Sequence, residues 1–246
     1  MSKRTCLIRL FIKTRVNALS VLLITVMVTY CLLMPSLTYA GIVIGGTRII
    51  YLSDKSDETI SIYSKEEKIP YLIQAWVDPF NKDDKTKAPF TVIPPVSRLE
   101  PAQEKILRIL HTQGVSLPDD RESVFWLNIK NIPPASNNKQ ANTLEIAIKT
   151  RIKLFWRPAS IRIIPEGAAP LVKWRREGRN LIVENPNPIH ISVMDVNIGG
   201  QDVPLNMIRP FETLTLPLPT NASGSKMTWR FINDYGAISK PIEQTL

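Results

Sequence analysis

The chain has 246 residues, enough for one large domain or two of modest size, and it carries a formal net charge of +9. Five of its 31 lysine and arginine residues, and none of its 22 acidic residues, fall within positions 1–40. Without that segment the net charge is only +4. So small an excess argues against a nucleic-acid-binding protein, which normally presents a strongly basic surface.

Residues 1–40 have the layout of a secretory signal. A basic start is followed by an apolar run of 17 residues, 18–34, and the segment ends on the small residue Ala40. We therefore predict that 1–40 is a cleavable signal peptide for export. The alternative is an uncleaved membrane anchor, since 17 residues is at the short end for a membrane span. Cys6 and Cys31 both lie here, so the exported chain would contain no disulfide.

Short β-like runs separated by turn residues follow, and the 20 prolines of the chain leave little room for long helices. This profile is typical of an all-β protein. The first run, 41–51, predicts a strand with a kink or bulge at Gly45 and Gly46. The next predicted strands are 58–64, 70–77, 90–93, 105–111 and 123–129, followed by the stretch 142–157. Seven strands at this spacing fit an immunoglobulin-like sandwich.

The stretch 142–158 is too long for an ordinary strand. Its apolar residues recur at alternate positions, which predicts one apolar and one polar face. They are Leu144, Ile146, Ile148, Ile152, Leu154 and Trp156; only Phe155 breaks the polar parity. Extended, this run would span on the order of 40 Å, whereas a typical strand spans about 17–20 Å. Part of the apolar face must therefore belong to a second layer or remain available to a partner.

A second series of strands begins after Pro158, which disfavours continuing the ladder. Strands are predicted at 161–164, 180–183, 190–196, 212–218, 226–232 and 238–242, with a helical turn within 167–176. The pattern indicates two β-sandwich domains, 41–157 and 158–246, joined by a very short linker.

Groups for catalysis or metal binding are sparse in this sequence. The two histidines, His111 and His190, are isolated, and the exported chain has no cysteine to complete a zinc site. No phosphate loop, dinucleotide fingerprint or nucleophile elbow is present. We therefore predict no catalytic residue, no metal, no cofactor and no small-molecule substrate.

Eight short segments, taken together and in order, identify a family. They are Arg48; 70–72 with 74–76; 94–95 with 98–101; 120–123; 131–134; 152–158; 184–186; and Asn233-Asp234-Tyr235-Gly236. Together they closely resemble the PapD-like periplasmic pilus chaperones of the chaperone-usher pathway. The short connection 132–141 is similar to that of the short-loop branch of this family.

The resemblance implies two immunoglobulin-like domains in an L or boomerang arrangement, with no enzymatic activity and no cofactor. It implies a periplasmic chaperone that binds, folds and caps pilus subunits by lending them a strand, and then delivers them to an outer-membrane usher. Pilus subunits, including the adhesin, and the usher are therefore the expected partners.

The resemblance places the lent side chains at Leu144, Ile146 and Ile148, with Asn142 and Thr150 less firmly matched. Alternate side chains would enter the open groove of a subunit while main-chain groups form hydrogen bonds with it. The alternative is that these residues face the core of the protein itself, which periodicity alone favours.

Arg48 and Lys153 match the two basic residues that hold the C-terminal carboxylate of the subunit in this family. Two cations on one carboxylate would form charge-assisted hydrogen bonds and fix the register of the added strand. Lys153 has the opposite parity to Ile148. Either a bulge or strong twist near Thr150 intervenes, or the anchor and the lent residues use different surfaces.

Glu122, Arg157 and Asp234 match the interdomain charge network of the family. We expect them to orient the two domains rather than perform chemistry. Two other interpretations remain open: a self-standing immunoglobulin-like surface adhesin or pilus subunit, and a β protein held in a membrane by residues 1–40. Two complete series of strands argue against a pilus subunit, which is a single incomplete domain.

Overall fold

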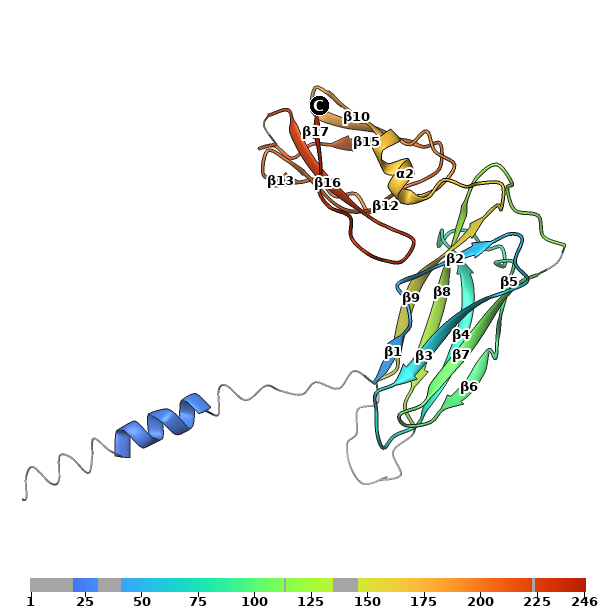
Figure 1. Ribbon diagram of the computed structural model, residues 1–246, viewed down its shortest axis with the longest axis vertical. Coiled ribbons are helices and arrows are strands. Elements are labelled where there is room, and N and C mark those ends of the chain that lie inside the picture. The colour runs from blue at the N-terminus through green and yellow to red at the C-terminus, as the bar shows by residue number, and fades with distance from the viewer. Residues whose placement is uncertain (1–19, 31–40, 113, 135–145, 223) are drawn as a thin grey trace, which may run out of the picture. The chain divides into compact units, whose positions relative to one another are not determined.

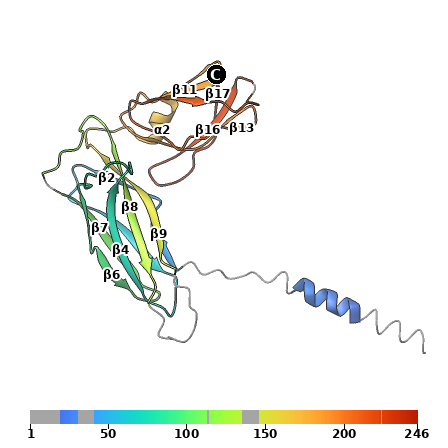
Figure 2. The same ribbon diagram turned by 180° about the vertical axis from the view of Figure 1, so that it is seen from behind.

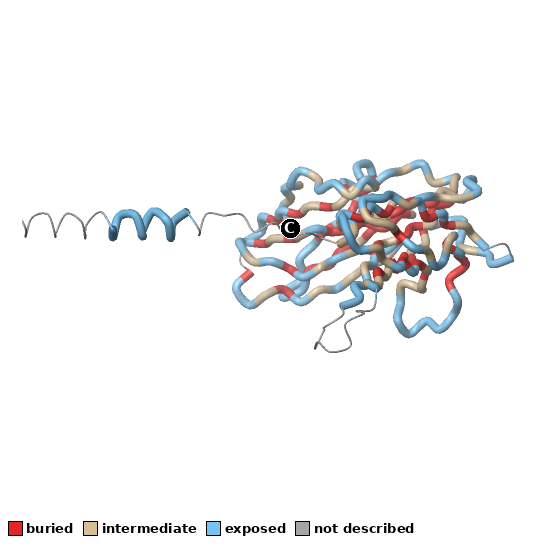
Figure 3. The backbone as a smooth tube through the Cα atoms, turned by 90° about the horizontal axis from the view of Figure 1, so that it is seen from below, coloured by how far each residue is buried: buried red, intermediate tan, exposed pale blue. Residues whose placement is uncertain are grey.

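The computed structural model describes residues 20–30, 41–112, 114–134, 146–222 and 224–246 (Figure 1). Residues 20–30 form an exposed helix within the predicted signal (Figure 3). No helix among the described residues is long and apolar enough to cross a membrane. The predicted cleavage point at Ala40 lies outside the described residues.

Two β-sandwiches make up the chain from residue 41 onward, which confirms the predicted all-β class. The strands of the first are β1 (Ile42–Ile44), β2 (Arg48–Leu52), β3 (Glu58–Ser64), β4 (Tyr71–Pro79), β5 (Phe90–Ile93), β6 (Val96–Leu99), β7 (Glu104–His111), β8 (Ser123–Ile132) and β9 (Ile148–Arg157). One sheet has the order β1-β3-β7-β5 and the other β2-β9-β8-β4-β6. Strand β6 was not predicted, because it follows directly after Pro94 and Pro95.

The first predicted strand changes sheets at its two glycines. Its first part, β1, pairs with β3, and its second part, β2, pairs with β9. Gly45 donates its N–H to the carbonyl of Ser61 at 2.9 Å. A Cβ on Gly45 would lie 2.5 Å from Ser61 Oγ and 3.3 Å from the Ser61 carbonyl oxygen, so the close approach of the two chains favours glycine. The predicted interruption at the glycine pair is confirmed.

The second sandwich begins with two short helical turns, α2 (Pro165–Ala168) and η1 (Ala169–Leu171). Its strands are β10 (Lys173–Glu177), β11 (Asn180–Glu184), β12 (Ile191–Ile198), β13 (Gln201–Asp202), β14 (Met207–Ile208), β15 (Thr213–Pro217), β16 (Lys226–Ile232) and β17 (Ile242–Thr245). They form the sheets β10-β11-β15 and β13-β12-β16-β17, and β14 also pairs with β12.

Two predictions for the second sandwich are wrong in detail, and a third is confirmed only in part. Residues 161–164 form no strand; Ile161 and Ile163 pack instead against the core from an irregular segment that ends at Pro165. Within the range 167–176, where a helical turn was predicted, Ala169–Leu171 form η1, but Trp174 lies in the extended β10. The last strand begins at Ile242 rather than 238, because Pro241 has no N–H for the ladder.

Each sandwich has its own core of buried apolar side chains, and buried positions alternate with exposed ones along the strands (Figure 3). Tyr51, Leu127 and Leu154 lie within the first core, and Trp229 and Ile191 within the second. Among the described residues no apolar side chain belongs to both cores. Hydrogen bonds and ion pairs of polar side chains are among the contacts that connect one sandwich to the other.

Candidate partner-binding edge

One side of β9 is unpaired over half its length. On one side β9 pairs with β8 along its whole length, from Ile148 opposite Asn131 to Trp156 opposite Ser123 (Figures 1 and 2). On the other side β2 pairs in parallel only from Lys153 onward, where Arg48 lies opposite it. Among the described residues, no strand pairs with residues 148–152 on that side. We call residues 148–152 the open edge.

Two of the three predicted donor side chains can be located. Ile146 is 62% exposed and Ile148 is 55% exposed, whereas Ile152, on the same parity as Ile148, is buried. Leu144 lies outside the described residues. Ile146 and Ile148 therefore do not pack in the core of this protein, which was the alternative interpretation for them. The apolar face of β9 passes from the core at Ile152 to solvent at Ile148.

Lys153 and Ile148 have opposite parity, which was explained either by a bulge or strong twist near Thr150 or by the use of two different surfaces. The register of β9 decides between these explanations. Pairing between β8 and β9 proceeds residue by residue through Thr150 without a shift. A bulge at that point is therefore excluded, and Lys153 lies on the opposite face from Ile148 and Ile152. The predicted anchor and the predicted donor side chains use different surfaces of one strand.

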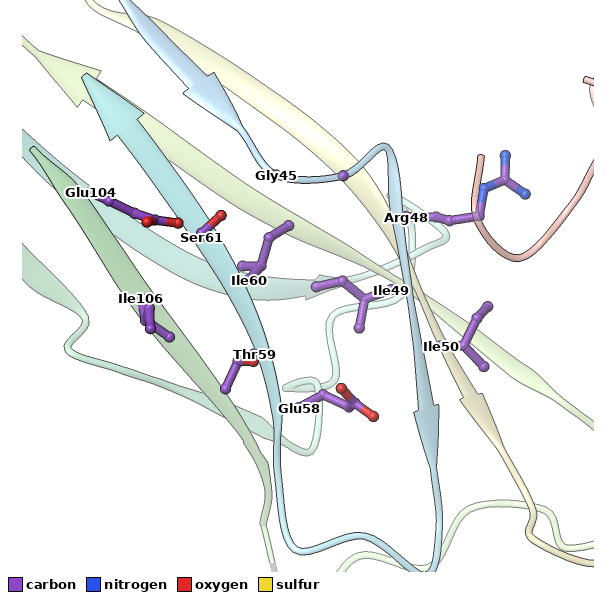
Figure 4. Close-up of a pocket in the computed structure, with 11 residues that line it drawn as sticks. Gly45, Arg48, Ile49, Ile50, Glu58, Thr59, Ile60, Ser61, Glu104 and Ile106 are labelled. Carbon is purple, nitrogen blue, oxygen red and sulfur yellow. The ribbon is translucent and has the colours of Figure 1, made fainter. Parts of the chain in front are cut away.

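Arg48 and Lys153 are direct register partners across β2 and β9. Arg48 Nη1 donates to the carbonyl of Ile232 at 3.2 Å, and Lys153 Nζ lies 3.4 Å from Ser192 Oγ. Both cations thus reach residues of the second sandwich, and Figure 4 shows the Arg48 guanidinium directed away from β3. The buried Nε of Arg48 has no hydrogen-bond partner among the described residues. The pair presents unused donors where the open edge ends.

Electrostatics at this pair favour an incoming anion. Burial, together with the charge of Arg48, lowers the pKa of Lys153 to about 8. Burial also lowers the pKa of Arg48, and the carboxylates of Asp234 and Glu122 only partly oppose that effect. Neither cation forms a salt bridge within the described residues. A carboxylate placed between them would supply the missing negative charge.

Glu122, Arg157 and Asp234, which were predicted to interact, are in direct contact. Arg157 Nε donates to Glu122 Oε1 at 2.8 Å, and its two terminal nitrogens donate to Asp234 at 2.7 and 2.9 Å. Burial alone would lower the pKa of Arg157, but the bonds and charges of the two carboxylates outweigh it and raise that pKa. Because Arg157 ends β9 and Glu122 directly precedes β8, this network links the first sandwich to the turn after β16.

His190 is a further member of the network that the sequence did not reveal. The main-chain N–H of His190 donates to Glu122 Oε2 at 2.8 Å, and the ring Nδ1 of His190 lies 2.9 Å from the same oxygen. The ring also lies 5.4 Å from that of Phe155. Ser192, two residues later, faces Lys153. Only the fold brings β12 to β9, so no spacing in the sequence could have identified these two contacts.

A depression of about 420 Å³ lies between β2 and β3, where the chain crosses from one sheet to the other (Figure 4). Thr59, Ser61, Glu104 and several isoleucines line it. Its side chains offer no arrangement of nucleophile and base. The described residues contain no group of three or more His, Cys, Asp or Glu that could hold a metal ion.

An unpaired strand edge flanked by exposed isoleucines, on a framework of two sandwiches, can accept an added strand of another polypeptide. Comparison with known proteins specifies the family. Residues 41–162 match the model of the pili and flagellar-assembly chaperone, PapD N-terminal domain, and residues 167–242 match that of the pili assembly chaperone PapD, C-terminal domain. The chain belongs to the PapD-like pilus-assembly chaperones.

Relatives over nearly the full length agree with this assignment. The chaperone protein FimC of Escherichia coli strain K12 is 37% identical over 223 residues, which cover 86% of this chain and 91% of FimC. The probable fimbrial chaperone protein ElfD of the same strain is 37% identical over 220 residues, which cover 87% of this chain and 93% of ElfD.

Solved structures show the same relationship. A structure of the Salmonella enterica SafA pilin with the SafB chaperone matches with a TM-score of 0.75 at 33% identity, covering 86% of this chain and 99% of that one. The Escherichia coli chaperone DraB matches with a TM-score of 0.73 at 35% identity, covering 85% of this chain and 100% of DraB. The predicted family is confirmed. The protein is a periplasmic chaperone of pilus assembly and not an enzyme, so the adhesin and pilus-subunit interpretations are wrong.

Proposed function

We propose that this chaperone captures pilus subunits at the open edge of β9 and carries them to an outer-membrane usher. The observation that supports it most strongly is the break in pairing on one side of β9. The free main-chain groups of residues 148–152 can form ladder hydrogen bonds with an added strand, and the exposed Ile146 and Ile148 can enter the groove of an incomplete sheet.

The position of β2 gives the added strand a direction and an end. β2 occupies the side of β9 from Lys153 onward, so a strand on the open edge stops where Arg48 begins β2. If its terminal carboxylate lies between Arg48 and Lys153, the preceding residues extend back toward Ile148. The added strand therefore runs parallel to β9, in line with β2. Charge-assisted hydrogen bonds to the carboxylate fix its register.

Co-expression of the full chain with a pilus subunit tests this proposal. We expect a one-to-one complex in the periplasmic fraction. Replacing Leu144, Ile146 and Ile148 by serine is expected to abolish the complex and leave the circular dichroism spectrum unchanged, because at least Ile146 and Ile148 lie outside the core. Leu72→Ser, which alters an exposed leucine on β4, is the matched control. Capture by the triple variant equal to that of the unaltered chain would contradict the proposal.

Residues 1–40 are proposed to be a cleaved signal, with the helix 20–30 as its apolar part. A basic start and a small residue at the end of the segment support cleavage. The mass of the chain recovered from the periplasm is the direct measurement. A mature protein beginning near residue 41 is expected, whereas recovery of the full-length chain from the membrane fraction would overturn this part of the proposal.

A further inference from the structure

Lys153 is a primary amine that has a cation and a neutral hydroxyl for neighbours. In the pairing of β9 it lies opposite Arg48 on β2 and opposite Trp126 on β8. Its Nζ lies 3.4 Å from Ser192 Oγ on β12. Within the described residues, no carboxylate forms a salt bridge with Lys153 or with Arg48. The amine therefore has no negative partner that would keep it protonated.

These surroundings favour the neutral amine, which is the nucleophilic form of lysine. Burial, and after it the charge of Arg48, lowers the pKa of Lys153 from 10.5 to about 8. Near neutral pH this raises the fraction of neutral amine on the order of 100-fold above that of an ordinary lysine. Lys153 is only partly buried, so a small reagent can reach it. Lys153 is thus suited to react with a small electrophile.

The same surroundings favour a product that carries negative charge. Arg48 places a cation beside Lys153, and the buried Nε of Arg48 has no hydrogen-bond partner among the described residues. The Ser192 hydroxyl can donate a hydrogen bond to an anionic group on Lys153. Acylation would leave a neutral amide, whereas addition of carbon dioxide leaves an anion. The anion turns repulsion between Lys153 and Arg48 into attraction.

We propose that Lys153 is a site of reversible carbamate formation with carbon dioxide, and that Arg48 is the counter-charge of the product. The neutral Nζ attacks the carbon of carbon dioxide and forms an N–C bond, while one C=O electron pair moves onto oxygen. The nitrogen then releases a proton to water, which leaves Lys153–NH–COO⁻. Starting from the ammonium, two protons are released in all, and carbon dioxide is the only co-reactant. The two positive charges of the pair become one positive and one negative charge.

The carbamate has the planar COO⁻ group of a chain terminus. It would occupy the place between Arg48 and Lys153 that the proposed function assigns to the terminal carboxylate of a subunit. Carbon dioxide is therefore expected to compete with subunit capture. Formation of the carbamate does not depend on capture, and only this consequence rests on the proposed function. When half of the chain is modified, the apparent affinity for a subunit should fall about twofold, because only the unmodified half binds.

Carbon-13 nuclear magnetic resonance of the full exported chain in labelled bicarbonate, which supplies dissolved carbon dioxide, detects the carbamate carbon directly. The N-terminal amine of the chain can form a carbamate as well, so a variant must assign the signal. Lys153→Arg keeps the positive charge but has no nucleophilic amine. We expect a carbamate resonance in the unaltered chain that is absent from Lys153→Arg and that disappears when carbon dioxide is removed.

A second variant tests the role of Arg48. Arg48→Met should weaken carbamate formation at Lys153 about 10- to 100-fold, because the anion loses a charge-assisted hydrogen-bond donor. The matched control is Arg162→Met, which removes one exposed arginine from the segment before α2. It should retain the resonance, and circular dichroism checks that both variants are folded. Equal loss of the resonance in the two variants would overturn the inference.

The remaining outcomes separate the modification from subunit capture. Absence of any carbamate resonance that depends on Lys153 would overturn the inference and leave the proposed function standing. Titration with a peptide that has the free C-terminus of a pilus subunit tests the competition. An affinity that stays constant while half of Lys153 is modified would overturn the competition. A chain that forms the carbamate but captures neither peptide nor subunit would overturn the proposed function, and the modification would stand.

Discussion

Lys153 and Arg157 lie on the same strand and the same face, but their electrostatic surroundings are opposite. Arg157 is buried with two carboxylates, and its pKa is raised. Lys153 lies beside a second cation, Arg48, and burial lowers its pKa to about 8. The charge of Arg157 is compensated within the chain, and that of Lys153 is not.

This difference distinguishes a structural charge from a binding charge. Isolated buried charge is costly, so a chain retains it only where something else compensates it. Glu122 and Asp234 do so for Arg157 and thereby connect the two sandwiches. For Arg48 and Lys153 the compensation is expected from the partner, and it becomes available when a chain terminus arrives at the end of the open edge.

The largest effect is expected from Arg157→Leu. Removing the guanidinium leaves Glu122 buried without its cation, and breaking a buried pair typically costs about 3–5 kcal/mol. Urea unfolding monitored by fluorescence measures the loss. Arg151→Leu, a change of an exposed cation on the same face, should alter stability by no more than about 0.5 kcal/mol. Equal effects of the two substitutions would contradict the comparison.

Alanine at Arg48 or at Lys153 is expected to weaken binding of a peptide with a free C-terminus by about 10- to 100-fold. A hydrogen bond to a charged group contributes about 1.5–3 kcal/mol, and each substitution removes one cation from the carboxylate. Calorimetric titration gives the affinities. For an amidated peptide the same substitutions should make little difference, and an equal loss for both peptides would rule out carboxylate recognition.

Lys153→Met should stabilise the free protein at neutral pH by about 1 kcal/mol, less than the full pKa shift implies because the ammonium keeps some contact with water. Below the folded pKa of about 8, both folded and unfolded states carry the proton, and the destabilisation by the buried charge is complete. As pH rises toward the ordinary lysine pKa, the gain from methionine should disappear. A gain that is constant from about pH 7 to 10.5 would contradict this origin.

The smallest effect on stability is expected from Ile146→Ser and Ile148→Ser. Both side chains are more than half exposed, so each change should cost no more than about 0.5 kcal/mol. Ile152→Ser, on the same face but buried, should cost several times more. Thermal unfolding of the three variants checks where the apolar face leaves the core. Equal losses at Ile148 and Ile152 would show that the whole face is internal.

The sequence was sufficient for the class of fold and for the importance of β9, because a period of two over so many residues is typical of a strand and incompatible with an amphipathic helix. It could also locate the interruption at Gly45 and Gly46, although not the change of sheet that occurs there. It could not decide whether Ile148 was internal, since parity assigns a face but not the layer that covers it. His190 and Ser192 were missed because their roles depend on pairing between distant parts of the chain.

Amide hydrogen exchange of β9, followed by nuclear magnetic resonance with and without a peptide bearing a free C-terminus, tests strand addition at the open edge most directly. We predict that alternate amides within residues 148–152 become protected on binding, while those from Lys153 to Arg157, already paired with β2, change little. Binding of the peptide with no added protection at residues 148–152 would contradict strand addition there.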